Sequence, residues 1–188
     1  MKKNISKNFI MAPMPVLIIA TYDENGIPNA MNAAWGMQCD NDAIMISLGN
    51  HKTTENIKLK KAFTVAFATK ETLVQSDYFG IETGACVNKI EKAGFHVIPS
   101  KTVDAPIIQE YPVTLECEVL ELLDDEGDYR LVGKVLNVVA DETVLNEQGK
   151  VDLSLLNLIS YDSASHLYRE VGPVVGRAFH DGLVVKNK

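Results

Sequence analysis

The segment from Ser47 to Ile57 brings together groups that could bind an anion. An apolar run ending at Ser47-Leu48 is followed by Gly49, by His51-Lys52-Thr53-Thr54 and then by an amphipathic pattern. A helix that begins near Thr53 or Thr54 leaves its first N–H groups without partners and carries partial positive charge at that end. Lys52 and His51 would add cationic donors, and Gly49 would allow close approach of the backbone. A phosphate site and an ordinary capped helix both fit these residues.

A second unusual segment runs from Pro28 to Gly36, where small residues stand in place of the large β-branched residues of a typical strand. Ala33 and Ala34 would clear space for a flat ligand, and Trp35 would offer an aromatic wall. Asn29 and Asn32 would offer hydrogen-bonding groups. The alternative is close packing of the alanines against a helix or another subunit, with Trp35 in the core.

The elements that must position these residues are mainly β-strands. Apolar or alternating runs predict strands at 16–21, 28–39, 43–48, 63–68, 111–123 and 129–140, joined by turn sequences such as Asp23-Glu24-Asn25-Gly26. Short helices are expected at 54–61, at 71–79 and within 83–94. Antiparallel strands with few helices favour a closed or partly open β-barrel with short helices. The turn at 40–42 would make the strands at 28–39 and 43–48 neighbours.

The chain length favours one domain over 1–188, with a core at about 13–140 and a C-terminal extension at 141–188 that hints at an oligomer. A formal charge of -7, with scattered lysines, argues against nucleic-acid binding. No apolar run is long enough to span a bilayer, so no membrane partner is expected. Three cysteines without a CxxC pair fit core packing in a reducing cytoplasm.

Several kinds of chemistry lack their sequence motifs. The chain contains no GxxxxGK[ST] loop, no GxGxxG after a strand and no GxSxG motif. The four histidines are far apart and have no companion residues at metal-binding spacing, so no metal site is expected. No pair of carboxylates stands out as a general acid and base. We therefore assign no catalytic side chain.

In combination, these segments resemble the flavin reductase-like family, the FMN-binding split-barrel proteins that include flavoredoxin. The resemblance covers roughly residues 13–140, and its order and spacing are more specific than any one motif. The matching segments are Pro13-Met14-Pro15-Val16, Asn25-Gly26-Ile27-Pro28-Asn29-Ala30, Asn32-Ala33-Ala34-Trp35, Ser47-Leu48, His51-Lys52-Thr53-Thr54-Glu55-Asn56-Ile57, Thr83-Gly84, Asn88-Lys89, Ala105-Pro106-Ile107-Ile108 and Leu115-Glu116-Cys117-Glu118-Val119.

The resemblance implies a Greek-key-like split barrel with non-covalent FMN at the interface of a homodimer. The flavin ring would lie along Asn32 to Trp35, and its phosphate near His51, Lys52, Thr53 and Thr54. Lys89 would reach the same pocket, although on its own it would be read as a solvated lysine. Ala34 stands where the family often has Ser or Thr, so a hydroxyl contact to the ring would be missing and backbone N–H groups would replace it.

A bound flavin would supply the redox chemistry. The resemblance implies an FMN-dependent oxidoreductase that takes electrons from NADH, NADPH or an iron-sulfur protein and passes them to a free flavin, a quinone or another acceptor. The alternative is an FMN-binding electron carrier or flavin-storage module without nicotinamide turnover. A split barrel that holds haem or a pyridoxal-type phosphate is a third reading. The residues do not distinguish these three readings.

Overall fold

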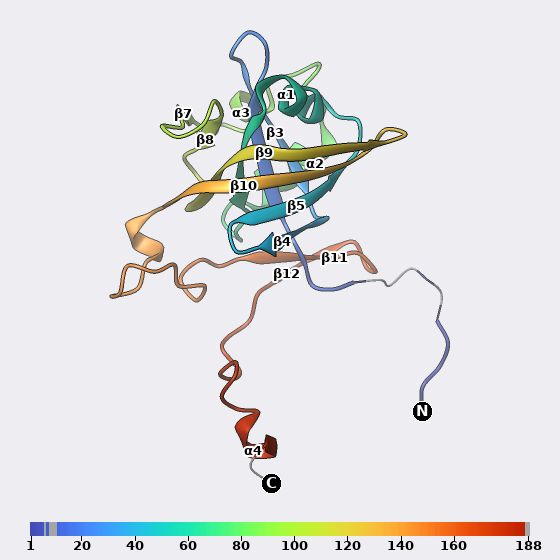
Figure 1. Ribbon diagram of the computed structural model, residues 1–188, viewed down its shortest axis with the longest axis vertical. Helices are drawn as coiled ribbons and strands as arrows, with labels where there is room; N and C mark the ends of the chain where they lie inside the picture. The colour runs from blue at the N-terminus through green and yellow to red at the C-terminus, as the bar shows by residue number, and fades with distance from the viewer. Residues whose placement is uncertain (6, 8–10, 187–188) are drawn as a thin grey trace.

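Seven antiparallel strands form one curled sheet in the order β3-β2-β6-β9-β10-β5-β4, shown in Figure 1. The computed structural model describes residues 1–5, 7 and 11–186. Its strands and helices are, in chain order, β1 (Met14–Pro15), β2 (Leu17–Tyr22), β3 (Pro28–Ala33), β4 (Gly36–Asp40), β5 (Ala43–Leu48), α1 (Lys52–Lys60), β6 (Ala62–Phe67), α2 (Leu73–Ile81), α3 (Lys89–Lys92), β7 (Val97–Pro99), β8 (Pro106–Ile108), β9 (Val113–Asp125), β10 (Asp128–Ala140), the 3-10 helix η1 (Glu142–Val144), β11 (Ile159–Asp162), β12 (Leu167–Glu170) and α4 (Leu183–Lys186).

Strand β2 is buried on both faces, which explains its uninterrupted apolar sequence. Leu17 and Ile19 point into the barrel, where they join a core that includes Phe63 and Leu131. Ile18 and its neighbours on the opposite face belong to a second core that includes Phe79 of α2 and Ile90 of α3. Helices α2 and α3 therefore lie against the outer face of the barrel at β2 and β3.

The segment 28–39, predicted as one strand, is divided in the structure. Strand β3 ends at Ala33 and β4 begins at Gly36, and the two strands lie at opposite edges of the seven-stranded sheet. Only Ala34 and Trp35 join the two edges. The prediction that this whole strand pairs with β5 was therefore wrong. Of its two parts, only β4 pairs with β5, and β3 pairs with β2. Pattern reading missed the break because a two-residue crossing has no turn signal of its own.

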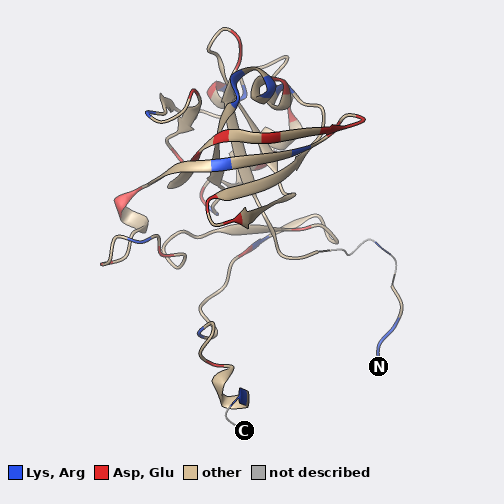
Figure 2. Cartoon of the chain, in the orientation of Figure 1, with Lys and Arg blue, Asp and Glu red and all other residues tan. Residues whose placement is uncertain are grey.

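The other predicted strands and helices are confirmed within a few residues. The β9–β10 hairpin turns at Glu126 and Gly127, which both have positive φ. Figure 2 shows acidic residues along the tip of this hairpin and basic residues on α1. The short helix expected within 83–94 is the single turn α3, and Gly94 with φ +73° follows it. The structure thus confirms a mainly antiparallel barrel with short helices.

The C-terminal segment contains a hairpin that the sequence did not predict. Strand β11 pairs with β12 on one side and with β1 on the other, so this three-stranded sheet ties the segment to the N-terminal part of the barrel. After β12 the chain runs away from the barrel toward α4, as Figure 1 shows. Val175 and Phe179 of this tail are almost fully exposed.

Two of the three cysteines are not core residues. Cys117 is buried in the barrel core as expected, whereas Cys39 and Cys86 are exposed. Composition cannot separate the two cases, because it does not show which strand face or loop carries each thiol. Within the described residues, the helices are too short or too polar to cross a membrane.

Candidate functional site

Helix α1 follows β5 after Gly49, Asn50 and His51, and its N-terminus has no side-chain cap. His51 is its N-cap residue, in an extended conformation, and its side chain makes no capping hydrogen bond. Lys52 is the first helical residue, two positions before the predicted range 54–61, and its Nζ lies 3.4 Å from Glu24 Oε2 of the β2–β3 turn. The first N–H groups of α1 are therefore open to an outside acceptor, and a cation stands beside them.

The two threonines of this turn have different environments. Thr53 Oγ1 accepts a hydrogen bond from Asn29 Nδ2 at 2.7 Å, which joins α1 to β3. Thr54 Oγ1 instead donates to the carbonyl of Gly49 at 2.8 Å. Both side chains are buried. Thr54 thus braces the loop before the helix, while Thr53 stays close to the groups of β3.

Lys89 is the least expected residue of the site, because its side chain is buried with only 3% exposure. Its Nζ donates to the carbonyls of Phe79 at 2.9 Å and Glu82 at 3.0 Å, both at the end of α2. Burial lowers the pKa of Lys89 to about 8, although the Glu82 carboxylate opposes this shift. The ammonium group is therefore still protonated at neutral pH. Its acceptors among the described residues are these two carbonyls and not a carboxylate.

Lys89 and the start of α1 line one cavity of about 310 Å³, which we call the Lys89 cavity. Its wall includes a glycine that must remain small, because a Cβ at Gly84 would lie 2.0 Å from Asn29 Oδ1. The lining residues are Asn29, Met31, Asn32, His51, Lys52, Thr53, Phe79, Gly80, Ile81, Glu82, Thr83, Gly84 and Lys89. Two lysines, a histidine and a helix N-terminus make this cavity suited to an anion.

A second cavity of about 410 Å³, which we call the Trp35 cavity, shares residues with the first, among them Asn32 and His51. The small side chains of Ala33 and Ala34 lie along one wall, and the ring of Trp35, 65% exposed, borders it. The lining residues are Met31, Asn32, Ala33, Ala34, Trp35, Ser47, Leu48, Gly49, His51, Asp77, Gly80, Ile81, Tyr161, His166 and Tyr168. The two cavities are the size of ligand sites and adjoin each other at the residues that line both.

Helix α2 and the β11–β12 hairpin close the far side of the Trp35 cavity. Tyr168 Oη donates to Asp77 Oδ1 at 2.7 Å, and Asn32 Nδ2 donates to the carbonyl of Ser76 at 2.9 Å. Burial, followed by the contact with Asp77, raises the pKa of Tyr168 to about 12, so this hydroxyl keeps its proton. The wall is therefore held by hydrogen bonds between separate elements.

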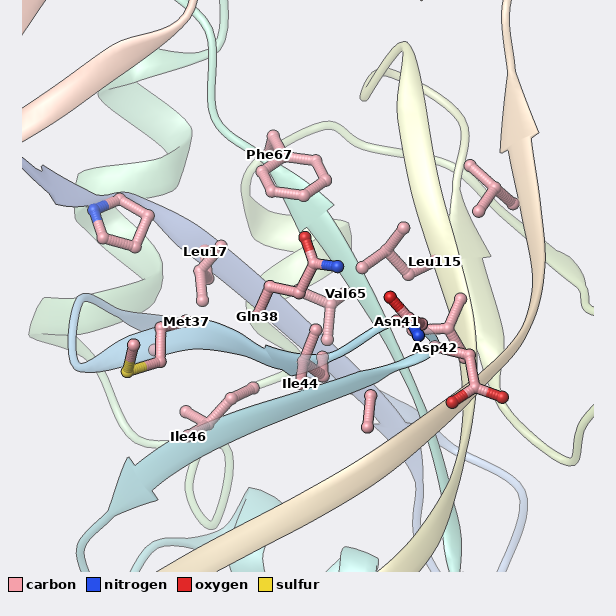
Figure 3. Close-up of a pocket in the computed structure, with 15 residues that line it drawn as sticks. Leu17, Met37, Gln38, Asn41, Asp42, Ile44, Ile46, Val65, Phe67 and Leu115 are labelled. Atoms are coloured by element: carbon pink, nitrogen blue, oxygen red, sulfur yellow. The ribbon is translucent and has the colours of Figure 1, made fainter. Parts of the chain in front are cut away.

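Figure 3 shows a third cavity, of about 520 Å³, lined mostly by residues of β2, β4, β5, β6, β9 and β10. Its labelled side chains are mostly hydrocarbon, among them Leu17, Ile46 and Phe67. Among the described residues that line it, Asp42 is the one charged group and no cation is present. This cavity lacks the positioned polar groups of the first two and shares none of their residues, so we do not assign the predicted site to it.

The structure brings the predicted site residues together with one exception. Thr54 lies outside both cavities. Asn29 lines the Lys89 cavity rather than the Trp35 cavity, so it is not placed to face a ring lying along Ala34 and Trp35. Of the others, Ala33, Ala34, Trp35, Ser47, Leu48 and Gly49 line the Trp35 cavity, Lys52, Thr53 and Lys89 line the Lys89 cavity, and Asn32 and His51 line both.

The small-residue segment 28–36 contains both closely packed positions and cavity-lining positions. Ala30 is fully buried in the core beneath α2 and α3, and Gly80 of α2 approaches the side chain of Asn32 closely. Ala33 and Ala34, in contrast, line the Trp35 cavity. Trp35 is not a core residue. Close helix packing and cavity formation therefore occur at successive positions of one segment.

Sequence reasoning missed the residues that come from α2 and from the C-terminal hairpin. Asp77, Tyr161, His166 and Tyr168 line the Trp35 cavity, although they lie far from its other residues in the chain. The recurrence of Tyr161 and Tyr168 in an otherwise exposed segment was the one available signal. Only the pairing of β11 with β1 explains how that segment reaches the cavity.

The fold and the two joined cavities define a split-barrel protein of the flavin reductase-like class. Residues 11–163 match the family model of the flavin reductase like domain, so the chain belongs to this family.

The structure is similar to flavoredoxin of Desulfovibrio vulgaris (Miyazaki F), with a TM-score of 0.92 and 28% identity over 97% of this chain and 100% of that one. It is similar to flavoredoxin from Methanosarcina acetivorans, with a TM-score of 0.89 and 27% identity over 98% and 99% of the two chains. An uncharacterised protein of Archaeoglobus fulgidus is 32% identical over 68% of this chain and 72% of its own length.

Proposed function

We propose that the protein binds FMN non-covalently and acts as an oxidoreductase through it. The observation that carries this proposal is the buried Lys89 ammonium, which faces the N-terminus of α1 across one cavity and adjoins a second cavity with a wall of small residues. A phosphate would compensate the buried charge, and a flat ring would fit beside Ala33 and Ala34. Membership of the flavin reductase-like family and similarity to two flavoredoxins support this assignment.

The residues present fit the two ends of FMN. Lys52, Lys89 and the first N–H groups of α1 would hold the phosphate, and the Asn29–Thr53 hydrogen bond would keep β3 and α1 in register around it. Trp35 and the backbone near Ala34 would position the ring. The bound flavin would accept electrons from NADH, NADPH or a redox protein and pass them to a free flavin or another acceptor. The side chains that would hold FMN are not needed as chemical catalysts.

We further propose that the protein acts as a homodimer with FMN at the interface. The tail after β12 supports this, because the side chains of Val174, Val175 and Phe179 are 86%, 98% and 102% exposed. Apolar groups at that exposure are commonly covered by another chain. Light scattering of the whole protein at several concentrations tests the oligomeric state.

The exposed thiols of Cys39 and Cys86 are compatible with the reducing cytoplasm, which is the location we propose.

Two measurements test the function. After incubation with FMN and removal of the excess, the protein should retain a yellow chromophore in one-to-one ratio with the chain, and a colourless protein would refute the proposal. Anaerobic stopped-flow mixing of the loaded protein with NADH or NADPH should bleach the flavin. If only dithionite or a reduced redox protein bleaches it, the protein is an electron carrier or a flavin store and not a nicotinamide-dependent oxidoreductase.

A further inference from the structure

The β11–β12 hairpin places one histidine at the wall of the Trp35 cavity. The connection between its strands ends at His166, and Asp162 fixes its shape by accepting hydrogen bonds from the N–H groups of Ala164 and Ser165. Arg169 Nε donates to the same carboxylate at 3.0 Å. Hydrogen bonds from Ser165 and Arg169 lower the pKa of Asp162 to about 2, so the carboxylate is charged across the neutral range. The end of the hairpin is thus a defined structure.

The imidazole of His166 is oriented by a neighbouring tyrosine. Its Nδ1 lies 2.8 Å from Tyr161 Oη, while the residue is exposed at the edge of the cavity. When the ring is protonated, Nδ1–H donates to Tyr161 and Nε2–H remains for another acceptor. Exposure to solvent allows the ring to regain a proton after giving one up. His166 has φ +55°, a conformation in which glycine and asparagine are also tolerated.

The other titratable groups around this cavity are engaged elsewhere. Tyr168 donates to Asp77, which ties the hairpin to α2. The ring of Tyr161 packs 6.0 Å from that of Tyr168, so the hydroxyl beside His166 belongs to the same fixed wall. His51 lies at the junction with the Lys89 cavity, where we place the phosphate. His166 lines the Trp35 cavity alone, whereas His51 also lines the Lys89 cavity with the anion-binding groups.

We propose that His166, oriented by Tyr161, donates a proton to the electron acceptor reduced in the Trp35 cavity. This inference rests on the proposed function and specifies its acceptor class as carbonyl compounds such as quinones, whose two-electron reduction takes up a proton on oxygen. A bound, reduced flavin would supply the hydride, which carries two electrons and one proton. The N–H bond at His166 Nε2 breaks, a new O–H bond forms on the acceptor, and the neutral imidazole takes a proton from water.

The test compares two acceptors that differ in their need for a proton. The FMN-loaded protein is reduced with dithionite and mixed anaerobically with 1,4-benzoquinone or with ferricyanide, which accepts an electron without a proton. His166→Asn should slow flavin reoxidation by the quinone about 100-fold, the lower range for loss of a general acid, and leave the ferricyanide rate unchanged. Tyr161→Phe should slow the quinone reaction less. His180→Asn, in the exposed tail, is the matched control and should change neither rate.

Two control measurements and a second variant separate the outcomes. The dissociation constant for FMN and the melting temperature should not change in His166→Asn, and His166→Gly keeps the backbone conformation without a side chain. An unchanged quinone rate in both variants overturns the assignment. Equal slowing with both acceptors also overturns it, because it indicates a role in holding the flavin. If the unmodified protein binds no FMN, the proposed function itself fails, and this inference fails with it.

Discussion

Replacing Lys89 by methionine should weaken FMN binding specifically through the phosphate. Methionine keeps most of the apolar stem of lysine but removes the ammonium group that donates to the carbonyls of Phe79 and Glu82. Riboflavin has the same ring and no phosphate, so it provides a matched ligand. We expect Lys89→Met to lower the affinity for FMN and to leave that for riboflavin nearly unchanged.

The magnitude follows from the pKa of Lys89. Burial lowers it from 10.5 to about 8, and the difference corresponds to about 3 kcal/mol by which burial disfavours the charged form. A bound phosphate would recover part of this free energy. Hydrogen bonds to charged groups contribute about 1.5–3 kcal/mol, so the dissociation constant for FMN should rise roughly 10- to 100-fold in the variant.

The same pKa predicts a pH dependence with a definite sign. Below about pH 8 the ammonium is charged in the unloaded protein, and the affinity for FMN should be constant. Above that pH the free protein loses this proton, so FMN binding must restore it and should weaken by up to about tenfold per pH unit. Folding stability changes in the opposite direction. Because the folded pKa is depressed, the unfolded chain binds more protons between pH 8 and 10.5, and the unloaded protein gains stability from this group there.

Fluorescence titration with FMN and riboflavin between pH 7 and pH 9.5 measures these effects. The ratio of the two affinities should fall with rising pH in the unmodified protein and stay flat in Lys89→Met. Lys92→Met, on the same short helix but exposed, is the control and should behave as the unmodified protein does. Equal losses of FMN and riboflavin affinity would refute the reasoning, because they would place the defect in the fold or the ring site.

Three further changes test close contacts and hydrogen bonds, two of them at the cavity walls and one at the buried Glu116. Gly84→Ala would place a Cβ 2.0 Å from Asn29 Oδ1, and urea unfolding should show a loss of about 1–3 kcal/mol. Tyr168→Phe removes the hydrogen bond to Asp77 and should cost about 1 kcal/mol in thermal unfolding. Burial raises the pKa of Glu116, but hydrogen bonds from neighbouring side chains outweigh it and hold the pKa below its usual value. Stability from Glu116 should therefore be present above pH 4.5 and lost as the pH falls through the folded pKa, and Glu116→Gln should flatten that part of the stability curve.

Two of these changes have close controls in the chain. Gly172→Ala adds a methyl group where no atom lies within 4 Å, so stability should not fall as it does in Gly84→Ala. Glu118→Gln alters the next acidic residue on β9, which is exposed, whereas Glu116 is buried. Acid sensitivity that persists in Glu116→Gln and disappears in Glu118→Gln would contradict the assignment.

The sequence predicted the barrel well because its strands bury one or both faces and therefore carry clear patterns. The run 43–48 is strand β5 with the predicted bounds, and β2 is shifted by one residue from its prediction. The break at Ala34 and Trp35 escaped prediction because small residues on both sides fit a continuous strand. Edge position in a sheet depends on pairings distant in sequence, which local pattern does not encode.

Site residues that lie next to a recognisable sequence signal were predicted. Site residues whose position depends on tertiary contacts were missed. The strand-to-helix corner at His51 and Lys52 is visible because a helix start has sequence preferences. The burial of Lys89 depends on the carbonyls at the end of α2, and pattern alone favoured a solvated side chain. Tyr161 and His166 reach the cavity only because β11 pairs with β1.

The two-residue crossing at Ala34 and Trp35 has a consequence for local opening of the barrel. It connects the two edge strands, β3 and β4, and the carbonyl of Trp35 accepts a hydrogen bond from the N–H of Ser47 at 2.8 Å. Edge strands usually fray independently of each other. Here a ligand seated against this crossing should restrain both edges at once, so hydrogen exchange should slow together in strands that lie at opposite ends of the sheet.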